Sequence, residues 1–230
     1  SLAITSPAMA LDGDLSGASV VGPRQRSAAP QLGELSLTFT AQQILPNDFS
    51  FPTFSPTPPS VVFDKAAQAA ADPFSVDATG HAPALREDRR DLVNLSPELL
   101  TTSGFGKLTV DNPDGNVTVP HNTHLAAPPL GSIKLFGANV NVEGSISAPG
   151  GTIGLTAYNI SPSVAVSIKL NNEPRPGANP SRGLVSLGSG SVLDAAGWIV
   201  DDRLRAISPL AKPLVTTGGS VSIRPLHAMV

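Results

Sequence analysis

One short phrase recurs along the chain and limits the folds that it can adopt. It consists of a glycine followed by two apolar residues that are separated by one small or polar residue. This alternation has the period of a β-strand with one face turned inward. The copies are Gly-Glu-Leu-Ser-Leu at 33–37, Gly-Lys-Leu-Thr-Val at 106–110, Gly-Ser-Ile-Lys-Leu at 131–135, Gly-Thr-Ile-Gly-Leu at 151–155, Gly-Leu-Val-Ser-Leu at 183–187 and Gly-Ser-Val-Ser-Ile at 219–223.

Further short alternating segments lie between these copies and predict additional strands. They are residues 116–119, 139–142 and 145–147, each bounded by Gly, Pro or Asn. Three short strands in roughly 20 residues is the spacing of one coil of a β-helix. A β-sandwich built from hairpins would also give alternating strands, but it would not place the same phrase at one point of every unit. We therefore predict an all-β, parallel β-helix solenoid for residues 104–230.

The spacing of the copies predicts long loop insertions between coils. Copies begin at 131, 151, 183 and 219, so the intervals are 20, 32 and 36 residues. The two longer intervals contain a Pro- and Asn-rich stretch at about 171–181 and a charged stretch at about 201–215. Stacking of the coils would place Ile133, Ile153, Val185 and Val221 in one apolar column.

The first part of the chain divides into two expected regions. Residues 1–45 read as coils with an insertion, with strands at 2–4, 9–11 and 33–39. Residues 46–103 read as a Pro/Phe-rich and partly helical insertion, with a short helix at 65–71. Within it, Ser96 and Pro97 suit the N-cap and first position of a helical turn.

Three phenylalanines are concentrated in the proline-rich stretch 46–59, where Pro disfavours strand pairing. Phe49, Phe51 and Phe54 could fill a groove on the side of the solenoid itself. Alternatively, they could form an exposed apolar loop that binds a partner.

Composition agrees with narrow stacked layers and excludes some partners. The chain has 230 residues, 40% of them hydrophobic, but its aromatic residues are only eight Phe, one Tyr and one Trp. With 23 Pro and 21 Gly, long helices are not expected. A net charge of −3 argues against nucleic-acid binding, and no apolar run reaches the roughly 20 residues of a transmembrane helix. The absence of Cys excludes disulfides.

Both ends of the sequence are strand-like and carry no polar cap. The chain opens on Ser1 without a basic start or signal peptide, and 220–224 alternates like a strand. Open edges of this kind favour aggregation. We therefore expect further coils of the same long chain on either side.

The phrases at 104–110, 116–120, 131–155 and 190–202, and the return at 218–221, resemble large exoproteins of the filamentous-haemagglutinin type. The resemblance covers about residues 95–230. It implies a right-handed β-helix, secretion through a partner pore, and display outside a Gram-negative-type bacterium as an adhesin or surface filament. The N-terminal secretion domain of that family has no counterpart here, and the Pro/Phe-rich insertion departs from its pattern.

No catalytic, cofactor or metal motif stands out, so we expect neither cofactor nor metal and no enzyme activity. His121 and His124 read as a surface pair without a third ligand. Residues 111–115 read as a tight turn rather than a Ca²⁺ loop. Trp198 suggests a packing anchor at a corner between coils. Asp194, Asp201 and Asp202 could serve a glycoside-cleaving site, although a solvated corner fits them better.

Three functions follow as hypotheses. The first is a non-catalytic structural or adhesive segment of a large secreted β-helical exoprotein that contacts other protein chains or surface glycans. The second is a polysaccharide-processing β-helix enzyme that uses the acids near Asp194 and Asp201. The third is a subunit of an assembled extracellular filament or sheath.

Overall fold

The computed structural model describes residues 1–11, 14–18, 32–40, 42–44, 53–55, 59–64, 78–80, 89, 91–174, 176–177, 179–200, 214–215, 217–226 and 228–229. This part is mostly strand with very little helix, and its largest sheet is parallel, which confirms the all-β expectation. The helical elements include the short 3-10 helix η1 (Pro97–Leu99) and α2 (Pro162–Leu170).

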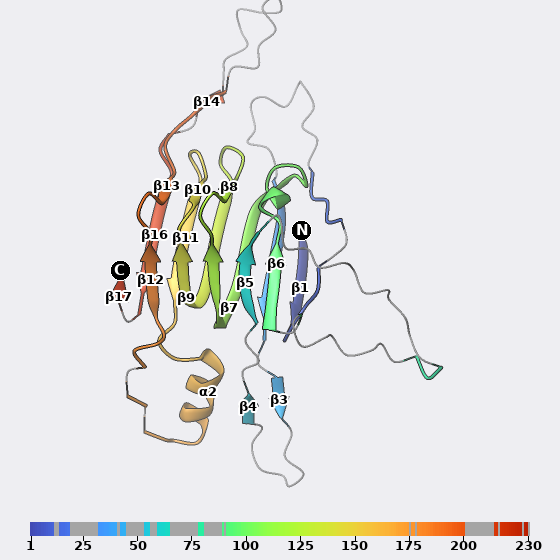
Figure 1. Ribbon diagram of the computed structural model, residues 1–230, viewed down its shortest axis with the longest axis vertical. Coiled ribbons are helices and arrows are strands. Elements are labelled where there is room, and N and C mark those ends of the chain that lie inside the picture. Colours follow the sequence, from blue (N-terminus) through green and yellow to red (C-terminus); the bar gives the residue numbers. More distant parts are fainter. Residues whose placement is uncertain are drawn as a thin grey trace, which may run out of the picture.

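Six strands run side by side in what we call the first stack, each parallel to its neighbours (Figure 1). The inward residues of the strands lie opposite one another, which forms continuous apolar columns. In order, the strands are β1 (Leu2–Ser6), β2 (Gly33–Phe39), the first part of β7 (Phe105–Val119), the first part of β9 (Ser132–Val142), β11 (Thr152–Ala157) and β16 (Ser220–Pro225).

A second stack lies around a bend in β7 and β9, where the register shifts between Asn112 and Asn116. Beyond the bend the two strands pair again, with Val117 opposite Val140. The other members of the second stack are β6 (Leu92–Leu95), β5 (Ser60–Phe63), β12 (Leu184–Leu187) and β17 (Ala228–Met229).

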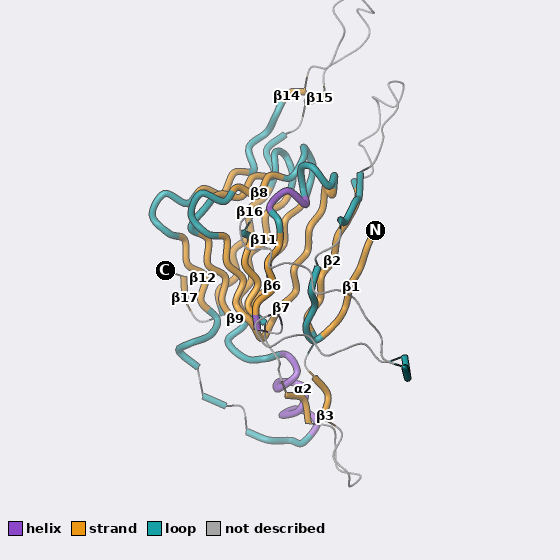
Figure 2. The backbone as a smooth tube through the Cα atoms, turned by 45° about the vertical axis from the view of Figure 1, so that its right-hand side comes forward, coloured by secondary structure: helices purple, strands orange, loops and turns teal. Residues whose placement is uncertain are grey.

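The third stack is a three-stranded parallel sheet of β8 (His124–Ala126), β10 (Ser145–Ser147) and β13 (Val192–Asp194). From β7 onward the chain passes through the first, second and third stacks in that order and then returns to the first. We call one such passage a circuit. Each circuit lies one strand further along the stacks. The path of the backbone can be traced in Figure 2.

The core fills the space between the stacks. Leu35, Leu108, Ile133 and Ile153 form one inward column of the first stack and are at most 1% exposed. Val221 continues this column in the last strand, but it is 43% exposed because the described residues include no strand beyond β16. Each column therefore gains its burial from neighbours on both sides.

Three of the recurring glycines, Gly131, Gly151 and Gly219, mark the corner where the chain enters the first stack. A Cβ on Gly131 would lie 2.6 Å from the carbonyl oxygen of Gly106, and one on Gly151 would collide with the carbonyl oxygen of Gly131. Gly219 has the same relation to Gly151. The same carbonyl groups accept hydrogen bonds, from Thr152 N to Gly131 O at 3.0 Å and from Ser220 N to Gly151 O at 2.8 Å. Glycine is required because successive backbones approach too closely for any side chain.

The copy at 183–187 belongs to a different stack from the others, so the predicted column was wrong at Val185. Ile133, Ile153 and Val221 do lie in one column, but Val185 lies opposite Val140 in the second stack. The interval from 151 to 219 is therefore one circuit with two insertions, rather than two coils. The copies look alike because both stacks need an inward branched residue at alternate positions.

Two insertions leave the same end of the stacks. The segment between β2 and β5 contains the antiparallel pair β3 (Gln42–Ile44) and β4 (Thr53–Ser55), and the segment between β11 and β12 contains α2. Figures 1 and 2 place these elements beside each other below the strands, and α2 contacts β4. The expected insertion at 171–181 is thus the second half of a longer one that begins with a helix we did not predict.

A third insertion leaves the opposite end, where β14 (Ile199–Val200) and β15 (Leu214–Val215) pair antiparallel. This pair lies at the borders of the stretch predicted at 201–215. Residues 201–213 themselves lie outside the described residues.

The expectation that 46–103 is wholly an insertion was wrong, because two of its segments join the second stack. β5 pairs with both β6 and β7, and Val61, Phe63 and Val93 are at most 2% exposed. These strands were obscured by the dense prolines before β5 and the charged stretch before β6, although each alternates in burial. The helical turn is confirmed: the Ser96 side chain accepts a hydrogen bond from Glu98 N at 3.2 Å. The helix expected at 65–71 lies outside the described residues.

Residues 9–11 do not form the strand that we expected. Met9 is nevertheless buried at 6% exposure, and Leu11 and Leu15 pack against the core. This segment therefore lines the β1 end of the core without joining a ladder.

Candidate functional sites

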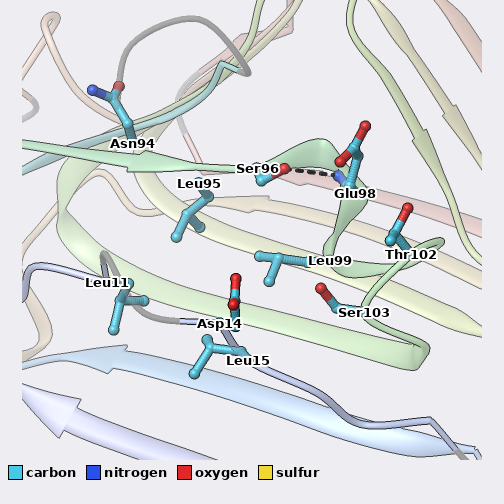
Figure 3. A pocket seen from close by; sticks show the side chains of 10 residues that line it. All are labelled: Leu11, Asp14, Leu15, Asn94, Leu95, Ser96, Glu98, Leu99, Thr102 and Ser103. Carbon is cyan, nitrogen blue, oxygen red and sulfur yellow. Dashed lines mark hydrogen bonds between the residues drawn. The ribbon is translucent and has the colours of Figure 1, made fainter. Parts of the chain in front are cut away.

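A small cavity lies between the segment at 11–15 and the chain from β6 through η1. Its volume is ≈ 230 Å³. Four leucines, Leu11, Leu15, Leu95 and Leu99, converge on one side of it (Figure 3). The polar lining residues are Asp14, Asn94, Ser96, Glu98, Thr102 and Ser103.

The cavity is fixed by backbone hydrogen bonds around η1. Glu98 O accepts hydrogen bonds from Thr101 N and Ser103 N, both at 3.1 Å, and Gly17 N donates to Ser103 O at 2.8 Å. In Figure 3, Asp14 points toward Leu99, whereas the carboxylate of Glu98 points away from the leucines. The cavity has room for one small amphipathic group, such as a single side chain.

A second polar cluster lies at the corner between the first and second stacks. Arg182 Nη2 donates to Pro113 O at 2.6 Å and to Asp114 Oδ1 at 3.3 Å, and Arg182 Nε donates to Tyr158 O at 3.3 Å. The side chains of Arg182 and Asp114 are only 18% and 9% exposed. One guanidinium therefore links the circuit of β12 to the circuit of β7, past the circuit of β9 between them.

Asparagines continue these links along the second stack. Asn139 Nδ2 donates to Asn116 Oδ1 at 2.9 Å, and Leu184 N donates to Asn139 Oδ1 at 3.1 Å. Asn112, which is 1% exposed, donates from Nδ2 to Pro59 O at 2.7 Å, while its buried Oδ1 has no hydrogen-bond partner among the described residues. The stretch 111–115 thus lies within β7, at the bend where the register shifts, rather than in the tight turn that we expected.

Asp111 lies on the outward side of this corner, in the row beside Phe136. Burial raises the pKa of Asp111 above its usual 3.8. The pKa of Tyr158 is raised above 10.0, first by burial and second by the charge of Asp111. The carboxyl and the phenol are therefore close enough to influence each other, although 47 positions separate them in the sequence (158 − 111).

The two histidines expected as a surface pair have separate partners. His121 Nε2 lies 3.9 Å from Glu143 Oε2, and His124 Nδ1 lies 2.6 Å from Ser145 Oγ. Within the described part of the chain, no group of three or more His, Cys, Asp or Glu residues could hold a metal ion. No described helix has the length and apolar character needed to cross a membrane.

Of the three acids considered for glycoside cleavage, only Asp194 is described. It is exposed at the end of β13, where its Oδ1 accepts a hydrogen bond from Ala196 N at 2.8 Å. Asp201 and Asp202 lie outside the described residues, so their convergence with Asp194 stays untested.

The expected partner-binding loop is described only at Phe54, whose backbone pairs with Gln43 in the β3–β4 pair. Phe49 and Phe51 lie outside the described residues. Pairing at Thr53–Ser55 is possible despite the surrounding prolines, because each paired residue keeps its N–H. Trp198, expected as a packing anchor, is 53% exposed.

Comparisons with models of protein families, with curated proteins and with solved structures find no match for this chain.

Proposed function

We propose that this chain is a structural and adhesive segment of a large secreted exoprotein of the filamentous-haemagglutinin type, folded as a right-handed parallel β-helix. The observation that carries the proposal is the ordered passage through three parallel stacks with in-register apolar columns. Parallel crossovers are right-handed in almost every known case. Insertions then leave from the corners, and the stacks serve as the rod that spaces them.

The proposal assigns the chain a mechanical role rather than catalysis. Its partners are flanking coils of the same long chain, other protein chains and surface glycans. The exposed inward residue Val221 supports continuation at the β16 side, since an added strand would bury it as its neighbours are buried. The place of action is the outside of a Gram-negative-type bacterium.

Surface labelling of the source cells tests the location. Antibodies against the purified chain should label intact cells, and protease added to intact cells should remove the signal. A cytoplasmic protein probed in parallel should be labelled only after permeabilisation. Labelling of the chain only in permeabilised cells would contradict the proposal.

An experimental structure of a longer piece of the same protein tests the fold. We expect added residues to continue all three stacks in register. A piece in which the strands beyond β16 pair antiparallel, or belong to a separate domain, would overturn the β-helical rod.

A further inference from the structure

The dipeptide Asp114-Gly115 lies inside β7, at the bend between the first and second stacks. An Asp-Gly pair is the sequence in which aspartate rearranges most readily to isoaspartate, because glycine has no side chain to shield its backbone nitrogen. The same dipeptide occurs at 12–13, outside the described residues. The bend therefore contains a reactive sequence, and the groups around it decide whether the reaction proceeds.

The rearrangement is intramolecular and consumes no co-reactant other than water. The backbone nitrogen of Gly115 bonds to Cγ of the protonated Asp114 side chain, and the side-chain hydroxyl leaves with the proton of that nitrogen as water. The product is a five-membered succinimide ring. Water then breaks the bond between the ring nitrogen and the main-chain carbonyl carbon of Asp114, so that the main chain now runs through Cβ and Cγ.

Arg182 opposes ring closure at two points. Its Nη2 donates to Asp114 Oδ1 at 3.3 Å and to Pro113 O at 2.6 Å. Ring closure needs the protonated carboxyl group, whereas the guanidinium group binds the carboxylate. Turning the Asp114 side chain toward Gly115 N would break the bond to Oδ1, and the bond to Pro113 O holds the preceding peptide unit in place.

Packing holds the other side of the dipeptide. A Cβ on Gly115 would collide with Pro59 O and with the side chain of Asn112. Asn112 Nδ2 in turn donates to Pro59 O at 2.7 Å, which fixes this contact. The Asp114 side chain is only 9% exposed, so little water reaches it. The reactive pair is therefore held between Arg182 on one side and the chain before β5 on the other.

We propose that Asp114-Gly115 is a latent isoaspartate site that Arg182 keeps unreacted. Conversion would add one atom to the main chain of β7 where its register with β9 shifts, and it would move the carboxylate away from Arg182. The link between the circuits of β12 and β7 would then be lost. This inference goes beyond the proposed mechanical role and does not depend on it.

Peptide mapping of aged protein tests the inference. The folded chain, and the same chain unfolded in guanidinium chloride, are incubated at neutral pH and then digested with trypsin. The two Asp-Gly pairs fall in separate tryptic peptides, 1–24 and 108–134. Isomerisation shifts the retention time of a peptide without changing its mass, whereas deamidation of Asn changes the mass. In peptide 108–134 we expect conversion at least about tenfold slower in the folded chain, because reaction there requires local opening.

Substitutions of Arg182 measure its share of the protection. In the folded protein, Arg182→Met should speed conversion at Asp114 roughly tenfold, since hydrogen bonds to a charged group contribute about one such step to the opening equilibrium. Arg182→Lys should speed it less, because the ammonium group keeps a charged donor. Adding Asp114→Glu to Arg182→Met should abolish the shifted peptide, because the larger ring that glutamate requires closes far more slowly.

Two matched variants separate loss of the guanidinium group from loss of stability. Gly151→Ala should destabilise the fold, because its Cβ collides with Gly131 O, but it leaves Arg182 in place. Asp114 should therefore stay protected in this variant. Arg224→Met removes a guanidinium group from the exposed side of β16 and should leave the rate unchanged. Circular dichroism before and after incubation shows that each variant is folded.

Three results would overturn the inference. They are equal conversion of Asp114 in the folded and unfolded wild type, conversion in folded Arg182→Met as slow as in the wild type, and a rate in Gly151→Ala as high as in Arg182→Met. The first comparison needs no variant, so it stands even where Arg182→Met fails to fold. Each result leaves the proposed function in place, because location and fold are tested separately.

Discussion

At the scale of single residues, the glycines at the corner of the first stack explain why the repeat phrase begins as it does. Their carbonyl groups both accept a hydrogen bond from the next circuit and occupy the space that a side chain would need. The glycine is thus set by distance between backbones rather than by an unusual dihedral angle. This requirement can be measured, because the same strand contains a second glycine in open surroundings.

We expect Gly151→Ala to lower the free energy of unfolding by about 1–3 kcal/mol, because the added methyl group collides with the carbonyl oxygen of Gly131. Gly154→Ala is the matched control. Its Cβ would lie 3.5 Å from the Lys134 side chain, an ordinary contact, so the variant should be neutral or slightly more stable. Urea unfolding measures both. Equal destabilisation by the two variants would contradict this account of the corner.

We expect the pKa of Tyr158 to depend on the charge of Asp111. The pKa of Tyr158 lies above 10.0 because of burial and, secondly, because of Asp111. In Asp111→Asn the second cause is removed, so the pKa should fall toward 10.0 while staying above it. Tyrosinate absorbance during an alkaline titration reports this one phenol directly. A pKa that is unchanged in the Asp111→Asn variant would place the two groups out of electrostatic reach.

Asp111→Asn should also change how the free energy of unfolding depends on pH. The folded-state pKa of Asp111 lies above 3.8, so the folded protein holds this proton more tightly than the unfolded chain does. The contribution of Asp111 to stability is therefore fully present below 3.8 and is lost as the pH rises through the folded-state pKa. Asp111→Asn should match the wild type below 3.8 and gain relative stability at neutral pH, as urea unfolding at both pH values would measure.

At the scale of elements, the insertions are attached to the stacks by particular side chains. Arg182 closes the insertion that carries α2, since it binds Tyr158 O at its start and Pro113 O and Asp114 two circuits away. Replacing this guanidinium leaves two backbone oxygens and a mostly buried carboxylate without their donor.

We expect Arg182→Met to lower the free energy of unfolding by about 2 kcal/mol, as for loss of hydrogen bonds to a charged group. Arg182→Lys should retain only part of this stability, because an ammonium group cannot donate the two-pronged hydrogen bonds of a guanidinium group. Arg224→Met, on the exposed side of β16, is the control and should change stability little. Thermal unfolding ranks the variants. The interpretation fails when Arg182→Met is as stable as Arg224→Met.

The elements also show which parts of this arrangement the sequence could predict. Alternation and the glycine phrase were sufficient for β2, β10 and β11, because those features are local. They could not distinguish the first stack from the second at Val185, because both stacks bury the same kind of residue. β5 and β6 were missed because prolines precede the first and a charged stretch precedes the second. The cluster of Asp111, Tyr158 and Arg182 depends on register between distant segments, which no local pattern carries.

At the scale of the whole molecule, the described core residues form one cluster that runs through successive circuits, so each circuit depends on its neighbours for burial. A residue in the middle of a column loses contacts on both sides when it is truncated. A residue in the last strand has contacts on one side alone among the described residues. The cost of the same substitution should therefore depend on its position along the stack.

We expect Ile133→Ala to lower the free energy of unfolding by about 3 kcal/mol, because the side chain is fully buried. Val221→Ala in the same column should cost less than about 1 kcal/mol, since Val221 is 43% exposed. Denaturant titrations give both values. Similar costs at the two positions would mean that β16 is covered in solution, and an oligomeric state above one would identify a second copy as the cover.

The hydrogen bonds that join the circuits all point along the direction in which the strands are stacked. A pulling force applied in that direction meets one strand at a time, and peeling breaks the bonds of that strand in sequence instead of loading many at once. The molecule should therefore yield under tension by releasing circuits singly, at low force, and recover them when the force is removed. A long chain built in this way would behave at a surface as an extensible tether, and the links made by Arg182 would be the points at which its extension pauses.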